Sequence, residues 1–181
     1  MKTESNVMYI LRLALTLLII TSVVAAALAG VNSITAPAIA KLTAEKTQQA
    51  IEAVLPGGGE AIEFASADLV SKVYKGENGY AVEVTPGGFD NTITMMVGVD
   101  FEGKVLGIDI IKHTETAGLG AVADAETPAG QNFRNQFVGT SGSVAVTKDG
   151  GSLDSITGAT ITSRAICDGV NAALACVETL G

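Results

Sequence analysis

The sequence predicts an α+β protein, in which a single N-terminal transmembrane helix precedes a domain of helices packed on a mainly antiparallel sheet. Three observations support this fold class. An uncharged, apolar run covers residues 13–31. In the middle of the chain, apolar residues alternate with polar ones, which is typical of strands. Near the C-terminus, apolar residues recur at helical spacing, which indicates an amphipathic helix.

The apolar run at residues 13–31 predicts a membrane-spanning helix. About twenty apolar residues cross the hydrocarbon core of a bilayer as a helix, and a helix is needed because lipid offers no partners to open backbone groups. A cleaved secretory signal is the alternative, since residues 27–29 (Ala-Leu-Ala) resemble a cleavage site. The run is long for a signal core, so we expect a retained, single-pass helix.

The charges beside this run predict its orientation. Lys2 and Arg12 precede it, and Lys41 and Lys46 follow it, so the count of positive residues is nearly balanced. Arg12 directly precedes the run, whereas the first charge after it is Lys41. Because positive residues close to a span favour the cytoplasm, we expect the main domain on the extracytoplasmic side of the cytoplasmic membrane.

The chain is expected to have three parts. Residues 1–31 form a tail and the transmembrane helix, residues 32–38 form a short linker that contains a proline, and residues 39–181 form the extracytoplasmic domain. This domain begins with a helix over residues 39–55, where apolar residues fall at helical spacing. A proline and a run of glycines end that helix.

Two β-hairpins are predicted next. Residues 69–88 read as two strands around a turn at Gly76–Gly79. Residues 91–113 read as a second pair around a turn at Asp100–Gly103. Alternate apolar residues of the second hairpin are expected to share one face of the sheet: Ile93, Met95, Val97 and Val99.

The remainder of the chain is predicted to mix loops and helices. A loop over residues 113–130 leads to a short helical piece in which Phe133 and Phe137 lie one turn apart. A strand at Val144–Thr147 follows, and a helix over residues 162–179 ends the chain. The apolar stripe of that helix consists of Ile166, Val170, Leu174 and Val177.

Composition excludes some classes of function. The net charge is −8 and no basic run is present, which argues against nucleic-acid binding, because that function needs clustered lysine and arginine. The two cysteines, Cys167 and Cys176, are expected on one helix, about 13.5 Å apart along its axis. That separation is too long for a disulfide and the spacing does not fit a metal site, so we expect buried packing thiols.

The stretch Asp154–Ile166 crowds hydroxyl residues around a Gly-Ala pair just before the last helix. Gly158 permits a tight backbone turn, and Thr160, Thr162 or Ser163 could cap the helix with a side-chain oxygen. A helix N-terminus with hydroxyls also suits an anion such as phosphate. The spacing alone favours simple capping and leaves both interpretations open.

A second stretch, His113–Gly120, contains the one histidine of the chain, a carboxylate, two threonines and two glycines. It matches no nucleophile triad and offers too few ligands for a zinc site, so no catalytic or metal-binding residue is assigned. Its glycines would let the backbone approach a flat ligand, although an ordinary loop has the same composition.

The two stretches together resemble a known family. Asp154–Thr160 fits the pattern Asp-x-x-(Ser/Thr)-Gly-Ala-(Thr/Ser), which marks proteins with covalently bound FMN, and His113–Gly120 resembles the paired motif His-x-Glu-Thr-Pro-Gly-Leu-Gly. With its N-terminal span, the chain resembles over nearly its whole length the family of G subunits of the Rnf complex, an ion-translocating ferredoxin:NAD oxidoreductase. The C subunits of the sodium-translocating NADH:quinone reductase are related. Ala117 departs from the motif, where the family has proline.

The resemblance implies a set of flavin-binding residues. It implies that Thr160 carries FMN through a phosphoester, formed when its hydroxyl attacks the FMN phosphate of an FAD donor on a dedicated flavin transferase. Asp154 would belong to the motif that the transferase recognises. Residues implied to surround the phosphate are Thr157, Gly158, Ala159, Thr162 and Ser163, and those implied to lie along the flavin ring are His113, Glu115, Thr116, Gly118, Leu119 and Gly120.

The resemblance also implies a function and partners. The chain would relay electrons as a redox subunit of an ion-translocating oxidoreductase and would need no organic substrate of its own. Its partners would be the other Rnf subunits (A, B, C, D and E), the flavin transferase during maturation, and the membrane. The alternatives are a part of a quinone reductase like its C subunit, an anchored or secreted non-redox binding domain, and an independent extracytoplasmic flavoenzyme.

Overall fold

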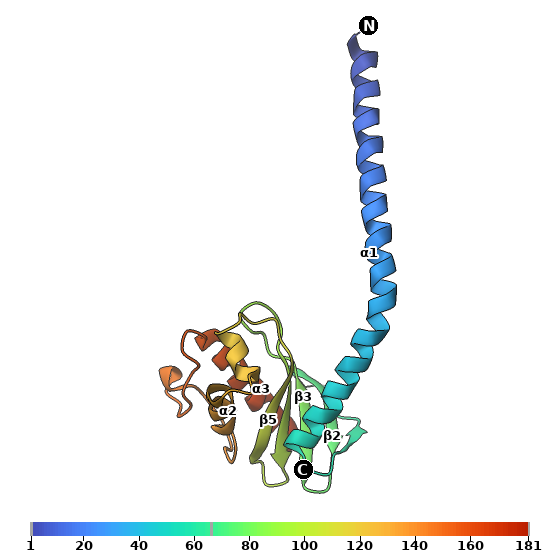
Figure 1. Cartoon of the computed structure of the whole chain (residues 1–181). Coiled ribbons are helices and arrows are strands. Elements are labelled where there is room, and N and C mark those ends of the chain that lie inside the picture. The colour runs from blue at the N-terminus through green and yellow to red at the C-terminus, as the bar shows by residue number, and fades with distance from the viewer. Residues whose placement is uncertain (1, 66, 181) are drawn as a thin grey trace. The chain divides into compact units, whose positions relative to one another are not determined.

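The protein begins with one long helix. In the computed structural model, which describes residues 2–65 and 67–180, helix α1 spans Lys2–Val54 (Figure 1). Among the described residues, α1 is the one helix long and apolar enough to cross a membrane, with a mean hydropathy of 2.4 in its most apolar stretch of 18 residues. Large apolar side chains along it, such as Leu17 and Ile20, are exposed. The helix thus has the length and composition expected of the transmembrane segment.

Residues 32–38, expected to be a linker, instead continue helix α1, and Pro37 lies inside it. A proline removes one backbone hydrogen bond, but its neighbours keep the helical path. The hydroxyl of Ser33 donates to the carbonyl of Ala29 and that of Thr35 donates to the carbonyl of Val31, so these polar side chains are satisfied within the helix. The chain divides into two compact units after Ala44, several residues beyond the expected linker.

The second unit is built on an antiparallel sheet of five strands in the order β1-β2-β3-β4-β5. The strands are β1 (Glu60–Ile62), β2 (Val70–Lys75), β3 (Gly79–Val84), β4 (Thr94–Asp100) and β5 (Val105–Lys112). Both predicted hairpins are confirmed, with β2 paired to β3 and β4 paired to β5. The short strand β1 was not predicted, because three residues are too few to show a period of two.

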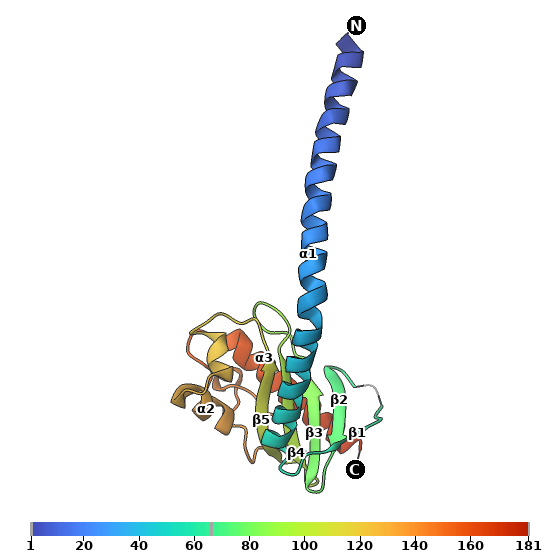
Figure 2. The same ribbon diagram turned by 45° about the vertical axis from the view of Figure 1, so that its right-hand side comes forward.

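Alternation along the strands gives the sheet two covered faces (Figure 2). On one face, Met95, Val97 and other buried residues pack with the C-terminal helix. On the other, Ala81 and Met96 pack against the end of α1. The backbone of α1 comes so close to β4 that a Cβ on Gly98 would overlap the carbonyl of Val54. Glycine at this position therefore allows the end of α1 to pack closely against the sheet.

The last helix, α3, spans Thr160–Glu178, close to its predicted range. All four residues of its predicted stripe are buried against the sheet: Ile166, Val170, Leu174 and Val177. Cys167 and Cys176 are free, buried thiols, as expected. Burial raises the pKa of the Cys167 thiol to about 11.

The segment between β5 and α3 contains three short helices. These are η1 (Gly120–Asp124), α2 (Pro128–Asn135) and η2 (Thr147–Asp149). Phe133 and Phe137 meet edge to face with ring centroids 5.5 Å apart, which agrees with the predicted helical piece. The predicted strand at Val144–Thr147 is wrong: Val146 forms an isolated bridge with Leu153, and the chain turns into η2 at the next residue.

Candidate functional site

The N-terminus of α3 is formed by the Gly-Ala-Thr triplet. Gly158 adopts a φ of +78°, and a Cβ there would lie 2.9 Å from Cδ2 of Leu119, so glycine suits both the turn and the contact. Ala159 is the N-cap residue and Thr160 begins the helix. Because alanine has no polar side chain, the helix has no side-chain cap.

The prediction that a hydroxyl caps α3 is therefore wrong, because the hydroxyls have other partners. Ser163 is fully buried; its Oγ donates to the carbonyl of Ala159 (2.9 Å) and accepts from the backbone N–H of Ile156 (3.0 Å). Thr162 Oγ1 donates to Glu115 Oε2 (2.6 Å). Thr160 Oγ1 accepts a hydrogen bond from Lys148 Nζ (2.8 Å). The Thr160 hydroxyl thus faces a cation at the domain surface.

A buried carboxylate, Glu115, connects three segments of the site. Its Oε1 accepts from the backbone N–H of Phe89 (2.8 Å), and its Oε2 accepts from Thr162. A Cβ on Gly88 or on Gly120 would overlap the oxygens of this carboxylate. The loop that contains Phe89, the loop that contains Glu115 and the first turn of α3 are therefore held together around one side chain that is 8% exposed.

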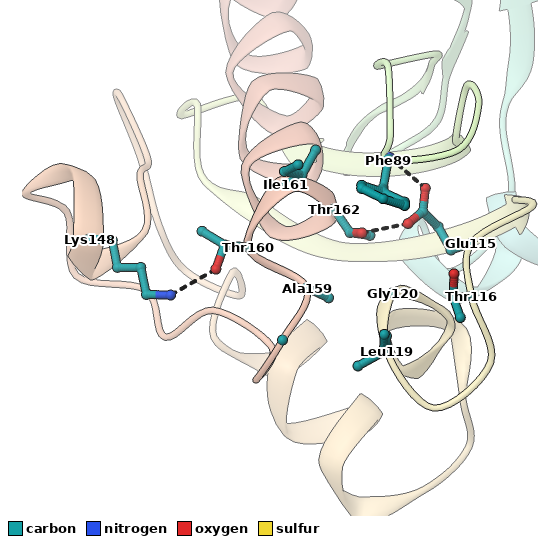
Figure 3. A pocket seen from close by; sticks show the side chains of 11 residues that line it. Phe89, Glu115, Thr116, Leu119, Gly120, Lys148, Ala159, Thr160, Ile161 and Thr162 are labelled. Atoms are coloured by element: carbon teal, nitrogen blue, oxygen red, sulfur yellow. Dashed lines mark hydrogen bonds between the residues drawn. The ribbon is translucent and has the colours of Figure 1, made fainter.

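These segments enclose a cavity of about 280 Å³ (Figure 3). Figure 3 shows the Thr160 hydroxyl turned toward Lys148 and the Thr162 hydroxyl turned toward Glu115. The predicted site residues that line this cavity are Glu115, Thr116, Leu119, Gly120, Gly158, Ala159, Thr160 and Thr162. The two motifs, far apart in the sequence, thus meet at one cavity.

The remaining predicted residues lie outside this cavity. Asp154, Thr157 and Gly118 line a neighbouring hollow of about 580 Å³. His113 and Ser163 are absent from the linings of both. The Nδ1 of His113 accepts from the backbone N–H of Glu115 (3.2 Å), and its Nε2 lies 3.5 Å from a carboxylate oxygen of Asp124. In this structure His113 therefore contacts the backbone of its own loop and does not line the cavity.

Three lining residues were missed by the sequence analysis: Phe89, Lys148 and Ile161. Phe89 and Ile161 are 66% and 50% exposed, and the lining residue Leu119 is 42% exposed, so large apolar side chains border the cavity. A large apolar residue directly after a Pro-Gly-Gly turn, where loops usually lie at the surface, was a usable signal for Phe89. Lys148 gave none, because it lies twelve residues before Thr160.

The arrangement combines features that suit a phosphorylated, planar ligand. The exposed apolar side chains of Phe89, Leu119 and Ile161 offer contact area to an aromatic ring. A hydroxyl at Thr160 and an ammonium at Lys148 offer a nucleophilic oxygen and a positive charge at one point. The absence of side chains at Gly120 and Gly158 lets the backbone pack closely on both sides of the cavity.

Comparison with known proteins matches this region to a family. Residues 88–175 match the FMN-binding domain family. The G subunit of the Na(+)-translocating ferredoxin:NAD(+) oxidoreductase complex of Acetobacterium woodii is 30% identical over 203 residues, which cover 99% of this chain and 97% of the relative.

Two further relatives are named as G subunits of ion-translocating oxidoreductase complexes. The protein from Methanosarcina acetivorans is 31% identical over 179 residues, which cover 91% of this chain and 93% of the relative. The protein from Yersinia pestis is 44% identical over 104 residues, about half of each chain. The relatives from Acetobacterium woodii and Methanosarcina acetivorans, at 30% and 31% identity, align over more than nine tenths of both chains. The chain therefore belongs to the family of G subunits of ion-translocating oxidoreductase (Rnf) complexes, and it contains an FMN-binding domain.

Proposed function

We propose that this chain carries an FMN joined to Thr160 by a phosphoester and relays electrons as one component of a membrane-bound, ion-translocating oxidoreductase. One observation carries the proposal: the Thr160 hydroxyl lies at a cavity that both motif stretches line, with Lys148 Nζ 2.8 Å away. The names of the relatives, which include a component of a ferredoxin:NAD(+) oxidoreductase complex, support the same function.

The residues present fit FMN. The phosphate would be held by the ester oxygen of Thr160, the ammonium of Lys148 and the first-turn N–H groups of α3, where the helix dipole favours negative charge. The ring would lie against the exposed apolar side chains of Phe89 and Leu119, which border the cavity. When bound, the flavin supplies the electron-transfer chemistry, and the protein supplies position, polarity and exclusion of water.

The structure supports a division of roles among the predicted residues. Thr160, with its partly exposed hydroxyl, is proposed as the attachment site. Thr162 and Glu115 form a buried pair that fixes the walls of the cavity. Asp154 and Thr157 lie in the adjacent hollow, where they are accessible to a flavin transferase that reads the motif. His113 and Ser163 act on the site through the backbone that they hydrogen-bond.

A covalent link has a physical advantage at this location. We propose that α1 anchors the protein in the cytoplasmic membrane by a single pass and that the unit beginning at Glu45 is extracytoplasmic. Free FMN would be scarce there, so a dissociable site would empty by mass action. The bond keeps the cofactor in place and sets its reach to redox partners in the other subunits.

The attachment is tested by mass. The full chain is co-produced with a flavin transferase, and its intact mass is compared with that of the chain produced without it. We expect a gain equal to FMN less one water, absent from Thr160→Ala and retained in Ser152→Ala, which removes another exposed hydroxyl of the same segment. A gain in mass that persists in Thr160→Ala would contradict the attachment site.

Two further experiments test the orientation in the membrane and the association with other subunits. A fusion of alkaline phosphatase after the C-terminus should be active if the domain is extracytoplasmic, and a well-expressed but inactive fusion contradicts the orientation. Affinity purification through the intact α1 should bring other subunits of the complex. Recovery of the flavinylated chain alone, under conditions that preserve membrane complexes, favours an independent flavoenzyme.

A further inference from the structure

A lysine that belongs to neither motif contacts the proposed attachment site. Lys148 belongs to η2, and its Nζ donates a hydrogen bond of 2.8 Å to Thr160 Oγ1 (Figure 3). Among the described residues that line the cavity, Lys148 is the one with a positive charge. The chain as a whole has a net charge of −8, so a cation at this point is contrary to the general charge of the protein.

The segment that carries Lys148 is fixed to α3 by several contacts. Asp149 accepts two hydrogen bonds from Arg164 of α3, from Nε and Nη2, both 2.6 Å long. At the start of the segment, the side-chain amide of Asn171 donates to the carbonyl of Val144 (2.9 Å) and accepts from its N–H (2.8 Å). The lysine is therefore presented to Thr160 by a loop with side-chain attachments on both sides of it.

The Arg164 contact also sets the local charge. The Arg164 guanidinium holds the pKa of Asp149 below its ordinary value, so this carboxylate is ionised near neutral pH. Lys148, Asp149 and Arg164 then carry two positive charges and one negative charge, which leaves one net positive charge beside Thr160. A single positive charge complements the single negative charge of a phosphodiester.

We propose that Lys148 is the positioning residue of the flavin attachment step, first holding the Thr160 hydroxyl and then pairing with the phosphate that this hydroxyl attacks. The inference depends on the proposed function, because it needs Thr160 as the acceptor. The ammonium moves from Thr160 Oγ1 to a non-bridging phosphate oxygen, which frees a lone pair on Oγ1 for bond formation. A long, flexible lysine side chain reaches both oxygens.

The step balances as a group transfer without redox change. A bond forms between Thr160 Oγ1 and the FMN phosphorus of a flavin adenine dinucleotide. The bond from that phosphorus to the bridging oxygen of the pyrophosphate breaks, and AMP leaves with the electron pair. The hydroxyl proton passes to a base of the transferase, which also supplies the divalent cation. Lys148 supplies positive charge to the phosphate oxygens as the transfer proceeds.

The test measures the attachment rate on the full chain. The protein is purified in detergent from cells without the transferase and mixed with purified transferase, FAD and Mg²⁺, and covalent flavin is followed by in-gel fluorescence. The variants are Lys148→Met, which removes the charge, and Lys148→Arg, which retains it. Lys104→Met is the matched control, because Lys104 lies in the β4–β5 turn and pairs with Glu102.

We expect Lys148→Met to lower kcat by about tenfold, which is less than the loss for a buried donor to developing charge, because Lys148 is exposed and water screens its charge. Lys148→Arg should restore most of the rate, and Lys104→Met should match the wild type. The wild-type rate should fall with added salt more steeply than the rate of Lys148→Met, because salt screens the charge of Lys148, which the variant lacks.

The outcomes separate this inference from the proposed function. If Lys148→Met is as fast as the wild type, or if only KM changes, the positioning role is wrong and Thr160 remains the attachment site. If Lys148→Arg is as slow as Lys148→Met while both melt like the wild type, charge is not what the step requires, and the inference is again overturned. If the wild-type chain takes up no covalent flavin at Thr160, the proposed function itself fails.

Discussion

The buried contact between Thr162 and Glu115 gives a sharp prediction about stability. Thr162 is 1% exposed and Glu115 is 8% exposed, and the hydroxyl donates to the carboxylate over 2.6 Å. The substitution Thr162→Val keeps nearly the same shape but removes the donor. Glu115 Oε2 is then left in a buried position without this hydrogen bond, while Oε1 keeps its bond from Phe89 N–H.

The expected magnitude follows from the charge of the acceptor. A hydrogen bond to a charged group contributes about 1.5–3 kcal/mol, so Thr162→Val should lower the free energy of unfolding by about 2 kcal/mol. For a domain of this size, each kcal/mol shifts Tm by roughly 3 °C, which predicts a decrease of about 6 °C. The loss should also loosen the loop that carries Phe89, because Glu115 holds its backbone.

The assay is thermal and urea unfolding of the full chain in mild detergent, followed by circular dichroism. Thr160→Val is the matched control: it removes a hydroxyl from the same turn, but that hydroxyl contacts the exposed Lys148. The control should change stability by less than about 0.5 kcal/mol. If Thr162→Val is no more destabilising than Thr160→Val, the buried contact does not have the energetic role assigned to it.

Three further predictions concern other parts of the domain. Gly120→Ala should lower Tm and reduce flavin attachment, because the new Cβ would overlap Glu115 Oε2 and lie 2.6 Å from Thr162 Oγ1; an unchanged melting curve contradicts this packing. Burial raises the pKa of Asp109 above its ordinary 3.8, and the nearby charge of Asp124 adds to this shift. The folded state therefore favours the protonated acid, and this carboxyl lowers the stability of the fold increasingly as the pH rises above 3.8. Asp109→Asn should therefore raise Tm relative to the wild type at pH 7 and not at pH 3, and a difference in Tm that is the same at both values refutes the shift. Cys167, whose pKa is raised to about 11 by burial, should resist iodoacetamide at pH 8 in the folded protein and react after denaturation; rapid alkylation of the native protein would show that the thiol is not buried.

The sequence predicted elements with strong local signals. The Gly-Glu-Asn-Gly turn and the flanking alternation located β2 and β3, and the stripe from Ile166 to Val177 located α3. Where the local signal was ambiguous, prediction failed. Residues 32–38 contain a proline and read as a linker, yet helix α1 continues through them, and the hydroxyls of Ser33 and Thr35 find partners within it.

The candidate site was predictable in part for the same reason. Motif residues identified Thr160 and the loop with Glu115, and these meet at one cavity. The partner of each side chain was not predictable, because it lies outside the motif and is brought near by the fold: Lys148 contacts Thr160, and Phe89 contacts Glu115. The capping role expected of Thr162 was wrong for this reason, since Glu115 takes its hydroxyl.

Tests of the central claim converge on a single tryptic peptide. Trypsin cleaves after Lys148 and Arg164 and releases residues 149–164, which contain Thr157, Thr160 and Thr162. From protein purified after maturation in its own membrane, we predict that this peptide carries FMN less one water and that fragmentation assigns the added mass to Thr160. The same peptide at its unmodified mass, or with the flavin on another residue, contradicts the account.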